Sequence, residues 1–208
     1  MKTIFLKLSV LALFLSLTSC DKDDAPKVEE ASILEIKTFN NLYAPQTGGQ
    51  GQPVGGEFTK FSFSENAIVT SDSWDIAFRG TTILVNGGTE IGITNEPLKT
   101  GIASVSIVND VFENIINFPN DSSFLQDGVN TYAIATGSNN GWYNYNPTTN
   151  LVLPLAGKVF VVKTHDGNYA KFEILSYYQD APSNPDQNSV GRYFTFKFVY
   201  QSESETNF

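Results

Sequence analysis

Residues 157–200 read GKVFVVKTHDGNYAKFEILSYYQDAPSNPDQNSVGRYFTFKFVY, and this stretch decides the fold. Residues 159–164 are rich in β-branched and aromatic side chains, which favour strands. Asp166-Gly167 follows as a turn pair typical of a type I′ hairpin, and residues 169–178 return as a longer strand. The sequence therefore predicts a β-hairpin at the centre of the domain.

A third strand follows the hairpin after a polar loop over residues 179–189. Residues 193–200 alternate with period two: three phenylalanines point to one side, and Thr195 and Lys197 point to the other. This pattern predicts one buried face and one solvated face, so the three segments together predict an antiparallel meander.

The composition agrees with a β domain. The chain has 208 residues, of which 41% are hydrophobic and 13% aromatic, with 16 glycines and 16 phenylalanines. This length is enough for one domain with a sizeable core. We therefore expect a mainly β fold of antiparallel sheets over residues 32–208, with one or two short helices.

The first 19 residues have the features of a bacterial lipoprotein signal peptide. Lys2 and Lys7 precede a short apolar run, residues 8–17, which is too short to span a bilayer. Leu17 and Ser19 then occupy the −3 and −1 positions of a lipobox that ends in Cys20. We expect lipidation of Cys20, which would anchor the mature protein to a membrane. The alternative is an ordinary signal peptide with a chance cysteine.

An acidic tether is expected over residues 20–31. Its first part, residues 21–24 (DKDD), resembles the export signal of surface lipoproteins, which implies an outer-membrane protein that faces the cell surface. A solvated tether without an export role is the alternative. Cys20 is the one cysteine, so disulfides are excluded. The formal charge of −9 becomes −11 without Lys2 and Lys7, which disfavours nucleic acid as a partner.

The remaining elements are predicted from local patterns. Val105, Val108, Val111, Phe112 and Ile115 recur at three- and four-residue spacing, which predicts a helix over residues 105–116. The glycine-rich segment 46–56 lacks the end of a phosphate-binding loop and is expected to be a connection. Strands are expected over residues 33–42, 58–63, 67–70, 73–80, 81–85 and 131–136.

The sequence offers little for catalysis. His165 is the one histidine and is expected to be solvated beside the turn, and no nucleophile or metalloprotease motif is present. Asp75 and Arg79 are expected to form a structural ion pair or to brace a turn. We therefore expect a protein that is not an enzyme and holds no metal through a protein cluster.

Four motifs carry a resemblance to a known family: residues 73–79 (SWDIAFR), residues 86–88 (NGG), residues 141–145 (GWYNY) and residues 163–172 (KTHDGNYAKF). They resemble landmarks of the HmuY family. The resemblance implies an all-β surface lipoprotein that binds haem as a hemophore for iron acquisition. It also implies an outer-membrane TonB-dependent receptor as the partner that takes over the haem.

The resemblance also implies a haem site beside the Trp-Tyr segment, with Trp142, Tyr143 and Tyr145 as binding residues and His165 as a further candidate. Haem-binding members hold iron with pairs of His or Met side chains. This chain departs from that pattern, because His165 is its one histidine and Met1 belongs to the signal peptide. Tyr143, Tyr145 or His165 could supply one ligand.

Two functions stay open at this point. The first is binding of haem or a related tetrapyrrole for uptake. The alternative is a non-enzymatic adhesion or assembly module that has the same fold and no haem site.

Overall fold

A computed structural model describes residues 34–202 and 207–208 of the chain. The predicted signal peptide 1–19 and the predicted tether 20–31, which includes Cys20, lie outside these residues. The largest sheet is antiparallel and has the strand order β1-β13-β12-β11-β8. Its strands are β1 (Lys37–Tyr43), β8 (Ser104–Asn109), β11 (Lys158–Lys163), β12 (Tyr169–Tyr178) and β13 (Gly191–Gln201).

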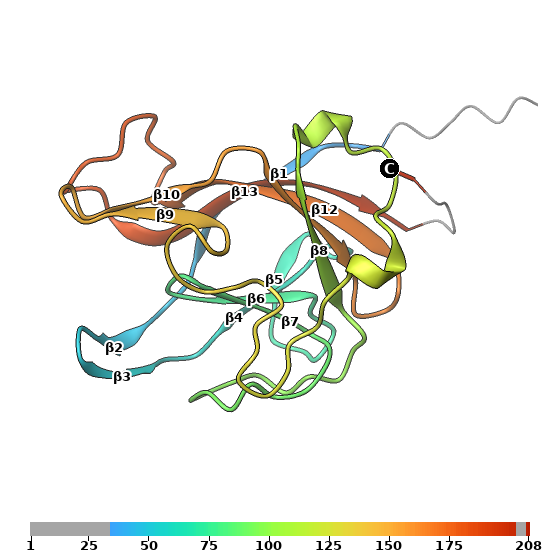
Figure 1. Ribbon diagram of the computed structural model, residues 1–208, viewed down its shortest axis with the longest axis horizontal. Coiled ribbons are helices and arrows are strands. Elements are labelled where there is room, and N and C mark those ends of the chain that lie inside the picture. The colour runs from blue at the N-terminus through green and yellow to red at the C-terminus, as the bar shows by residue number, and fades with distance from the viewer. Residues whose placement is uncertain (1–33, 203–206) are drawn as a thin grey trace, which may run out of the picture. The chain divides into compact units, whose positions relative to one another are not determined.

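A second antiparallel sheet has the order β5-β4-β6-β7, and two separate hairpins, β2–β3 and β9–β10, complete the strands (Figure 1). The strands of the second sheet are β4 (Thr59–Ser62), β5 (Ala67–Val69), β6 (Ile76–Arg79) and β7 (Thr82–Val85). The hairpin strands are β2 (Thr47–Gly49), β3 (Gln52–Gly55), β9 (Tyr143–Asn146) and β10 (Leu151–Pro154). Two single-turn 3₁₀ helices, η1 (Phe112–Asn114) and η2 (Asp121–Ser123), lie in connections. The expected mainly β fold is confirmed.

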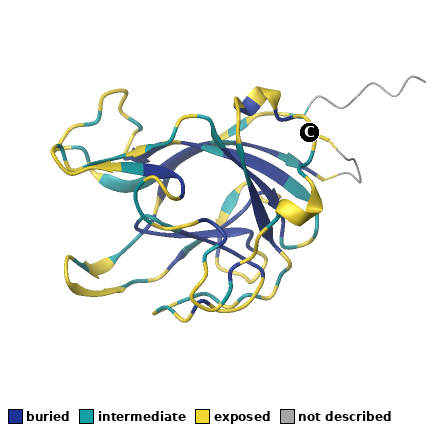
Figure 2. Ribbon diagram, viewed as in Figure 1, coloured by how far each residue is buried: buried dark blue, intermediate teal, exposed yellow. Residues whose placement is uncertain are grey.

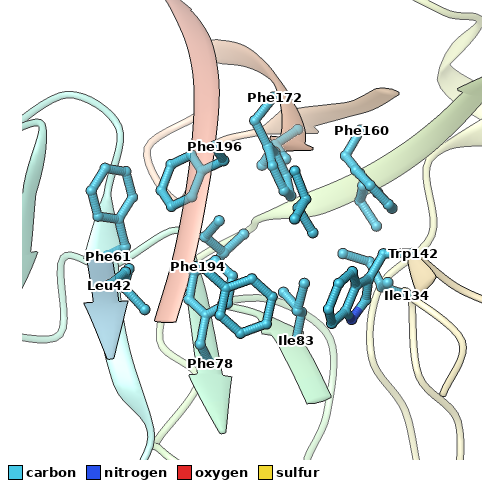
Figure 3. Packing of buried hydrophobic residues seen from close by; sticks show 14 of the residues in the cluster. Leu42, Phe61, Phe78, Ile83, Ile134, Trp142, Phe160, Phe172, Phe194 and Phe196 are labelled. Carbon is cyan, nitrogen blue, oxygen red and sulfur yellow. The ribbon is translucent and has the colours of Figure 1, made fainter. Parts of the chain in front are cut away.

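The core lies between the two sheets. Phe61 and Phe78 of the second sheet pack against Phe194 and Phe196 of β13, with ring centroids 5.1 Å apart for Phe61–Phe196 and 4.8 Å apart for Phe78–Phe194 (Figure 3). Each buried phenylalanine contributes about 1.5–3 kcal/mol of transfer free energy. Figure 2 shows the strands dark where they face this core and the hairpins and loops largely exposed.

The organising meander is confirmed. β11 pairs with β12, and β12 pairs with β13, both antiparallel. The turn between β11 and β12 differs from the expected type I′. Gly167 N–H donates to the Thr164 carbonyl, and Gly167 has a φ of +92°, while neither His165 nor Asp166 has a positive φ. The reversal is thus an ordinary turn followed by one left-handed glycine, a common three- to five-residue hairpin connection.

The predicted helix over residues 105–116 is wrong. Residues 104–109 form β8, which pairs with β11, and the one helical turn in that range is η1. Val105 faces the central core, whereas Val108 packs in an outer cluster with Phe112 and Ile115. The three-residue spacing therefore joins side chains on opposite faces of a strand, and the β-branched content of this segment prevails.

Two other predictions also differ from the structure. Residues 131–136 form no strand, because they make only an isolated bridge at Thr131. Segment 46–56 is not a plain loop, since β2 and β3 form a hairpin within it. The other predicted strands occur with shifted ends. Among the described residues, no helix is long and apolar enough to cross a membrane.

Candidate functional site

A cavity of about 450 Å³ lies where β1 ends and β13 begins, next to the end of β12. We call it the tyrosine cavity, because four tyrosine rings line it together with one arginine. Its volume lies in the range of small-molecule sites. The lining residues are Tyr43, Asn150, Val152, Tyr177, Tyr178, Ser189, Val190, Gly191, Arg192 and Tyr193.

Two irregularities in β12 place adjacent tyrosines on this wall. The pairing of β12 with β13 shifts register on both sides of Ser176, and the Ser176 hydroxyl accepts a hydrogen bond from Tyr178 N–H at 3.1 Å. In a regular strand, neighbouring side chains point to opposite faces. Here Tyr177 and Tyr178 are both buried, 7% and 5% exposed, because a bulge re-aims one of them.

The start of β13 and the residues before it form a further part of the wall, with five consecutive lining residues, Ser189, Val190, Gly191, Arg192 and Tyr193. Arg192 has a φ of +70°, in the left-handed region that a bulky residue rarely adopts. This kink explains why neighbours along the strand line the same cavity. Such strain, of order 1–3 kcal/mol, persists only where the surroundings impose it, and it is concentrated at functional sites.

The Arg192 guanidinium lies between a backbone oxygen and a phenol. Its Nη1 donates to the Gln46 carbonyl at 2.8 Å, and the side chain also hydrogen-bonds Tyr177. Burial raises the pKa of Tyr177 to about 12, although Arg192 acts in the opposite direction. The Tyr177 phenol is therefore neutral at physiological pH.

The other tyrosines of the cavity are ordered by contacts of their own. The Tyr178 hydroxyl accepts a hydrogen bond from Val152 N–H at 2.9 Å and so ties β12 to β10. The rings of Tyr43 and Tyr193 lie side by side, with centroids 4.9 Å apart, and Tyr43 is 45% exposed. These two rings give the cavity an accessible aromatic surface.

Two further cavities border the same region. One of about 590 Å³ lies between β10, the outer side of β12 and the 179–190 loop, and it shares Tyr177 and Tyr178 with the tyrosine cavity. Another of about 440 Å³ lies between residues 149–151 and 185–188. Figure 1 shows the β9–β10 hairpin and the loop from β12 to β13 at one end of the large sheet. Three cavities therefore lie together at this end of the sheet.

The predicted aromatic residues lie beside the tyrosine cavity but do not line it. Trp142 is 1% exposed, packs on Tyr177 with ring centroids 5.5 Å apart, and donates from Nε1 to the Thr81 carbonyl. Tyr143 is also buried. Tyr145 is 40% exposed, and its hydroxyl donates to the side chain of Asn150, which lines the cavity. Trp142 and Tyr143 thus support the wall from behind.

His165 lies elsewhere. It belongs to the turn that precedes β12, whereas Tyr177 and Tyr178 end that strand; β12 has 10 residues, so at about 3.3 Å per residue its ends are roughly 30 Å apart. The His165 ring is only 19% exposed, and its Nδ1 lies 2.8 Å from Asp75 Oδ1. The expectation that His165 is solvated is therefore wrong, since a buried carboxylate holds the ring.

Asp75 and Arg79 do not pair with each other. Asp75 accepts hydrogen bonds from the backbone N–H groups of Phe63 and His165, at 2.7 and 2.8 Å. Arg79 instead donates to the carbonyls of Gly56 and Thr94. Both residues brace connections, which agrees with the structural role expected for them, although the predicted ion pair is absent from the described residues.

The donors at the tyrosine cavity do not match the usual axial ligands of haem. Protein haem iron is commonly held by His, Met or Cys, and in some proteins by Tyr. The described residues contain no Met or Cys, and His165 is remote. Among the described residues, no group of three or more His, Cys, Asp or Glu side chains could hold a metal. The site has an aromatic surface and one cation, but none of the His, Met or Cys side chains that commonly hold haem iron.

Sequence reasoning missed the residues that form this site. A signal was present: the Tyr177-Tyr178 pair and the Arg192-Tyr193 pair flank the same polar loop. The two ends of a hairpin loop lie close together, so these pairs had to meet. Tyr43 carried no such signal, because its place depends on the pairing of β1 with β13.

Comparison with known proteins gives one family match. The family model described as HmuY protein matches residues 56–198. Among solved structures, the chain is similar to a candidate lipoprotein of Bacteroides fragilis, with 13% identity, a TM-score of 0.48, and 85% of this chain and 95% of that chain covered. No curated protein matches the sequence.

Two more solved structures are similar at 14% identity. One is a candidate HmuY-like haem-binding protein from Bacteroides vulgatus, with a TM-score of 0.44 and with 81% of this chain and 92% of that chain covered. The other is the apo form of the HmuY analogue of Tannerella forsythia, with a TM-score of 0.43 and with 82% and 97% covered.

Proposed function

The chain belongs to the HmuY family, and from this membership we propose that it is a lipid-anchored, non-enzymatic protein that binds haem or a related tetrapyrrole for uptake. Lipidation of Cys20 and display on the outer face of the outer membrane are part of the proposal. They rest on the sequence of residues 1–24.

The tyrosine cavity is the observation that carries the proposal. A tetrapyrrole is a flat, largely apolar ring with acidic side chains. Aromatic side chains such as Tyr43 and Tyr193 stack on flat π systems, and an arginine recognises carboxylates. A half-buried Arg192 that lines the same cavity as these rings suits a ligand of this shape and charge.

The protein's own residues would bind and orient the ligand, not transform it. Tyr178 ties β10 to the cavity through Val152, and Trp142 supports Tyr177 from the core. These contacts keep the walls in place, so little ordering is required when a ligand enters. We propose that a TonB-dependent receptor of the outer membrane then receives the ligand, as the family resemblance implies.

The poor fit to iron favours a second candidate function. The cavity offers no His or Met. An adhesion or assembly module on the same fold would also lack these iron ligands. Such a module would use the exposed rim, including Tyr145, for contact with another protein and would bind no tetrapyrrole.

A titration separates the two functions. Hemin is added to purified residues 21–208, which contain the whole described β domain, and absorbance and intrinsic fluorescence are recorded. We expect saturable one-to-one binding that weakens at least fivefold in Tyr43→Ala, while Ile68→Ala, a similarly exposed residue on β5, binds as wild type does. Absence of saturable binding would reject the tetrapyrrole function and leave the adhesion module.

A further inference from the structure

The charge of Arg192 is not neutralised by the protein. Within residues 34–202 and 207–208, no carboxylate lies within ion-pair distance of its guanidinium. Its contacts are a backbone carbonyl and a neutral phenol. A guanidinium has five N–H donors, so donors remain for an anion. Arg192 is half-buried at the cavity wall, where an anion would be partly shielded from water.

No histidine or methionine at the cavity is available to hold iron. His165 is bonded to buried Asp75 at the other end of β12, and no other histidine exists. At the cavity, the Tyr178 hydroxyl already accepts a backbone N–H, and the Tyr177 phenol is buried beside Arg192. A ferric ion prefers the ionised phenolate, and burial opposes its formation at Tyr177.

We infer that the tyrosine cavity recognises the ring and a carboxylate of its tetrapyrrole, with Arg192 as the carboxylate partner, and does not recognise the metal. This inference rests on the proposed function and refines it, since it names the ligand class as acidic tetrapyrroles with or without iron. It follows that hemin and iron-free protoporphyrin IX bind with similar affinity.

The test compares two ligands on three proteins. Dissociation constants for hemin and for protoporphyrin IX are measured by fluorescence quenching on residues 21–208, on Arg192→Gln and on Lys37→Gln. The Lys37→Gln control also removes one positive charge, but Lys37 lies at the end of β1 opposite to Tyr43. Circular dichroism confirms that each variant is folded, and the comparison of the two ligands on the unmodified sequence needs no variant.

We expect the two dissociation constants to agree within about threefold on the unmodified sequence. Arg192→Gln should weaken both ligands about tenfold, equivalent to about 1.4 kcal/mol, and Lys37→Gln should leave both unchanged. Hemin binding more than tenfold tighter than protoporphyrin IX would overturn the inference while the proposed function stands. Equal losses of affinity in Arg192→Gln and Lys37→Gln would also overturn it, because the loss would then reflect the overall charge of the protein and not a contact with Arg192. Binding of neither ligand would reject the proposed function itself.

Discussion

Asp75→Asn tests how the two sheets are joined. Asp75 precedes β6 of the second sheet and is fully buried, and it accepts hydrogen bonds from His165 in the β11–β12 turn of the first sheet. Its Oδ2 accepts Phe63 N–H at 2.7 Å. In the variant, an amide oxygen at Oδ1 preserves both contacts to His165. The amide nitrogen then faces Phe63 N–H, so one donor opposes another.

The expected loss is about 2–4 kcal/mol of the free energy of unfolding. A hydrogen bond to a charged acceptor contributes about 1.5–3 kcal/mol, and a buried donor without a partner costs about 1–3 kcal/mol; these overlap at one site. Burial raises the pKa of Asp75, and an amide avoids that desolvation cost, which favours the lower half of the range. For a domain of this size the melting temperature should fall by roughly 5–15 °C.

Urea unfolding followed by tryptophan fluorescence measures the effect. Asp72→Asn is the matched control, because Asp72 is 62% exposed and lies 3.6 Å from Lys60 in a surface ion pair. Such a pair contributes little, so the control should stay within about 0.5 kcal/mol of the original sequence. If Asp75→Asn behaves like Asp72→Asn, the buried link between the sheets does not carry the stability assigned to it.

Three further predictions follow from other sites. His165→Asn preserves a donor toward the buried carboxylate and should change hemin affinity less than twofold, so a tenfold loss in titration would refute the placement of the site. Burial raises the pKa of Glu96, but hydrogen bonds from three backbone N–H groups and the Lys99 charge leave it below the ordinary 4.5. The stabilisation that ionised Glu96 provides is complete above this ordinary pKa, and it is lost as the pH falls through the lowered pKa. The urea midpoint should therefore fall more steeply between pH 5 and pH 3 than in Glu96→Gln, and equal slopes would contradict this account. Lys171 donates to two carbonyls at η1, at 3.1 and 2.6 Å, so Lys171→Met should lose about 1–3 kcal/mol in urea unfolding; a change no larger than that of Lys158→Met would argue against it.

The central meander could be predicted because its information is local. Alternation of Phe194, Phe196 and Phe198 with polar residues fixes one buried face, and the structure buries all three fully. The hairpin at Gly167 was also evident, since a left-handed glycine in a turn is a local requirement. The type of turn was not evident, because residues on both sides of the turn contact other elements.

The segment after residue 103 shows where local patterns are ambiguous. Val105 and Val108 have the spacing of a helix face, yet β8 turns them to opposite sides of a sheet. Only the pairing with β11, a contact between residues far apart in the chain, decides between the two readings.

The candidate site depends on such distant contacts even more strongly. Tyr43, Tyr178 and Arg192 come from three strands, and the bulges of β12 and the left-handed backbone at Arg192 direct their side chains into one cavity. Period-two reasoning places one of each adjacent pair on the wrong face. The family resemblance indicated the end of the domain where the tyrosine cavity lies, through Trp142 and Tyr145, but it did not identify the residues that line this cavity.

A crystal structure of residues 21–208 with protoporphyrin IX tests the central claim most directly. We expect the ring to lie against Tyr43 and Tyr193, with one of its carboxylates within about 3 Å of the Arg192 guanidinium. A ring bound at the β11–β12 turn beside His165, or at the tyrosine cavity with its carboxylates directed away from Arg192, would contradict the account.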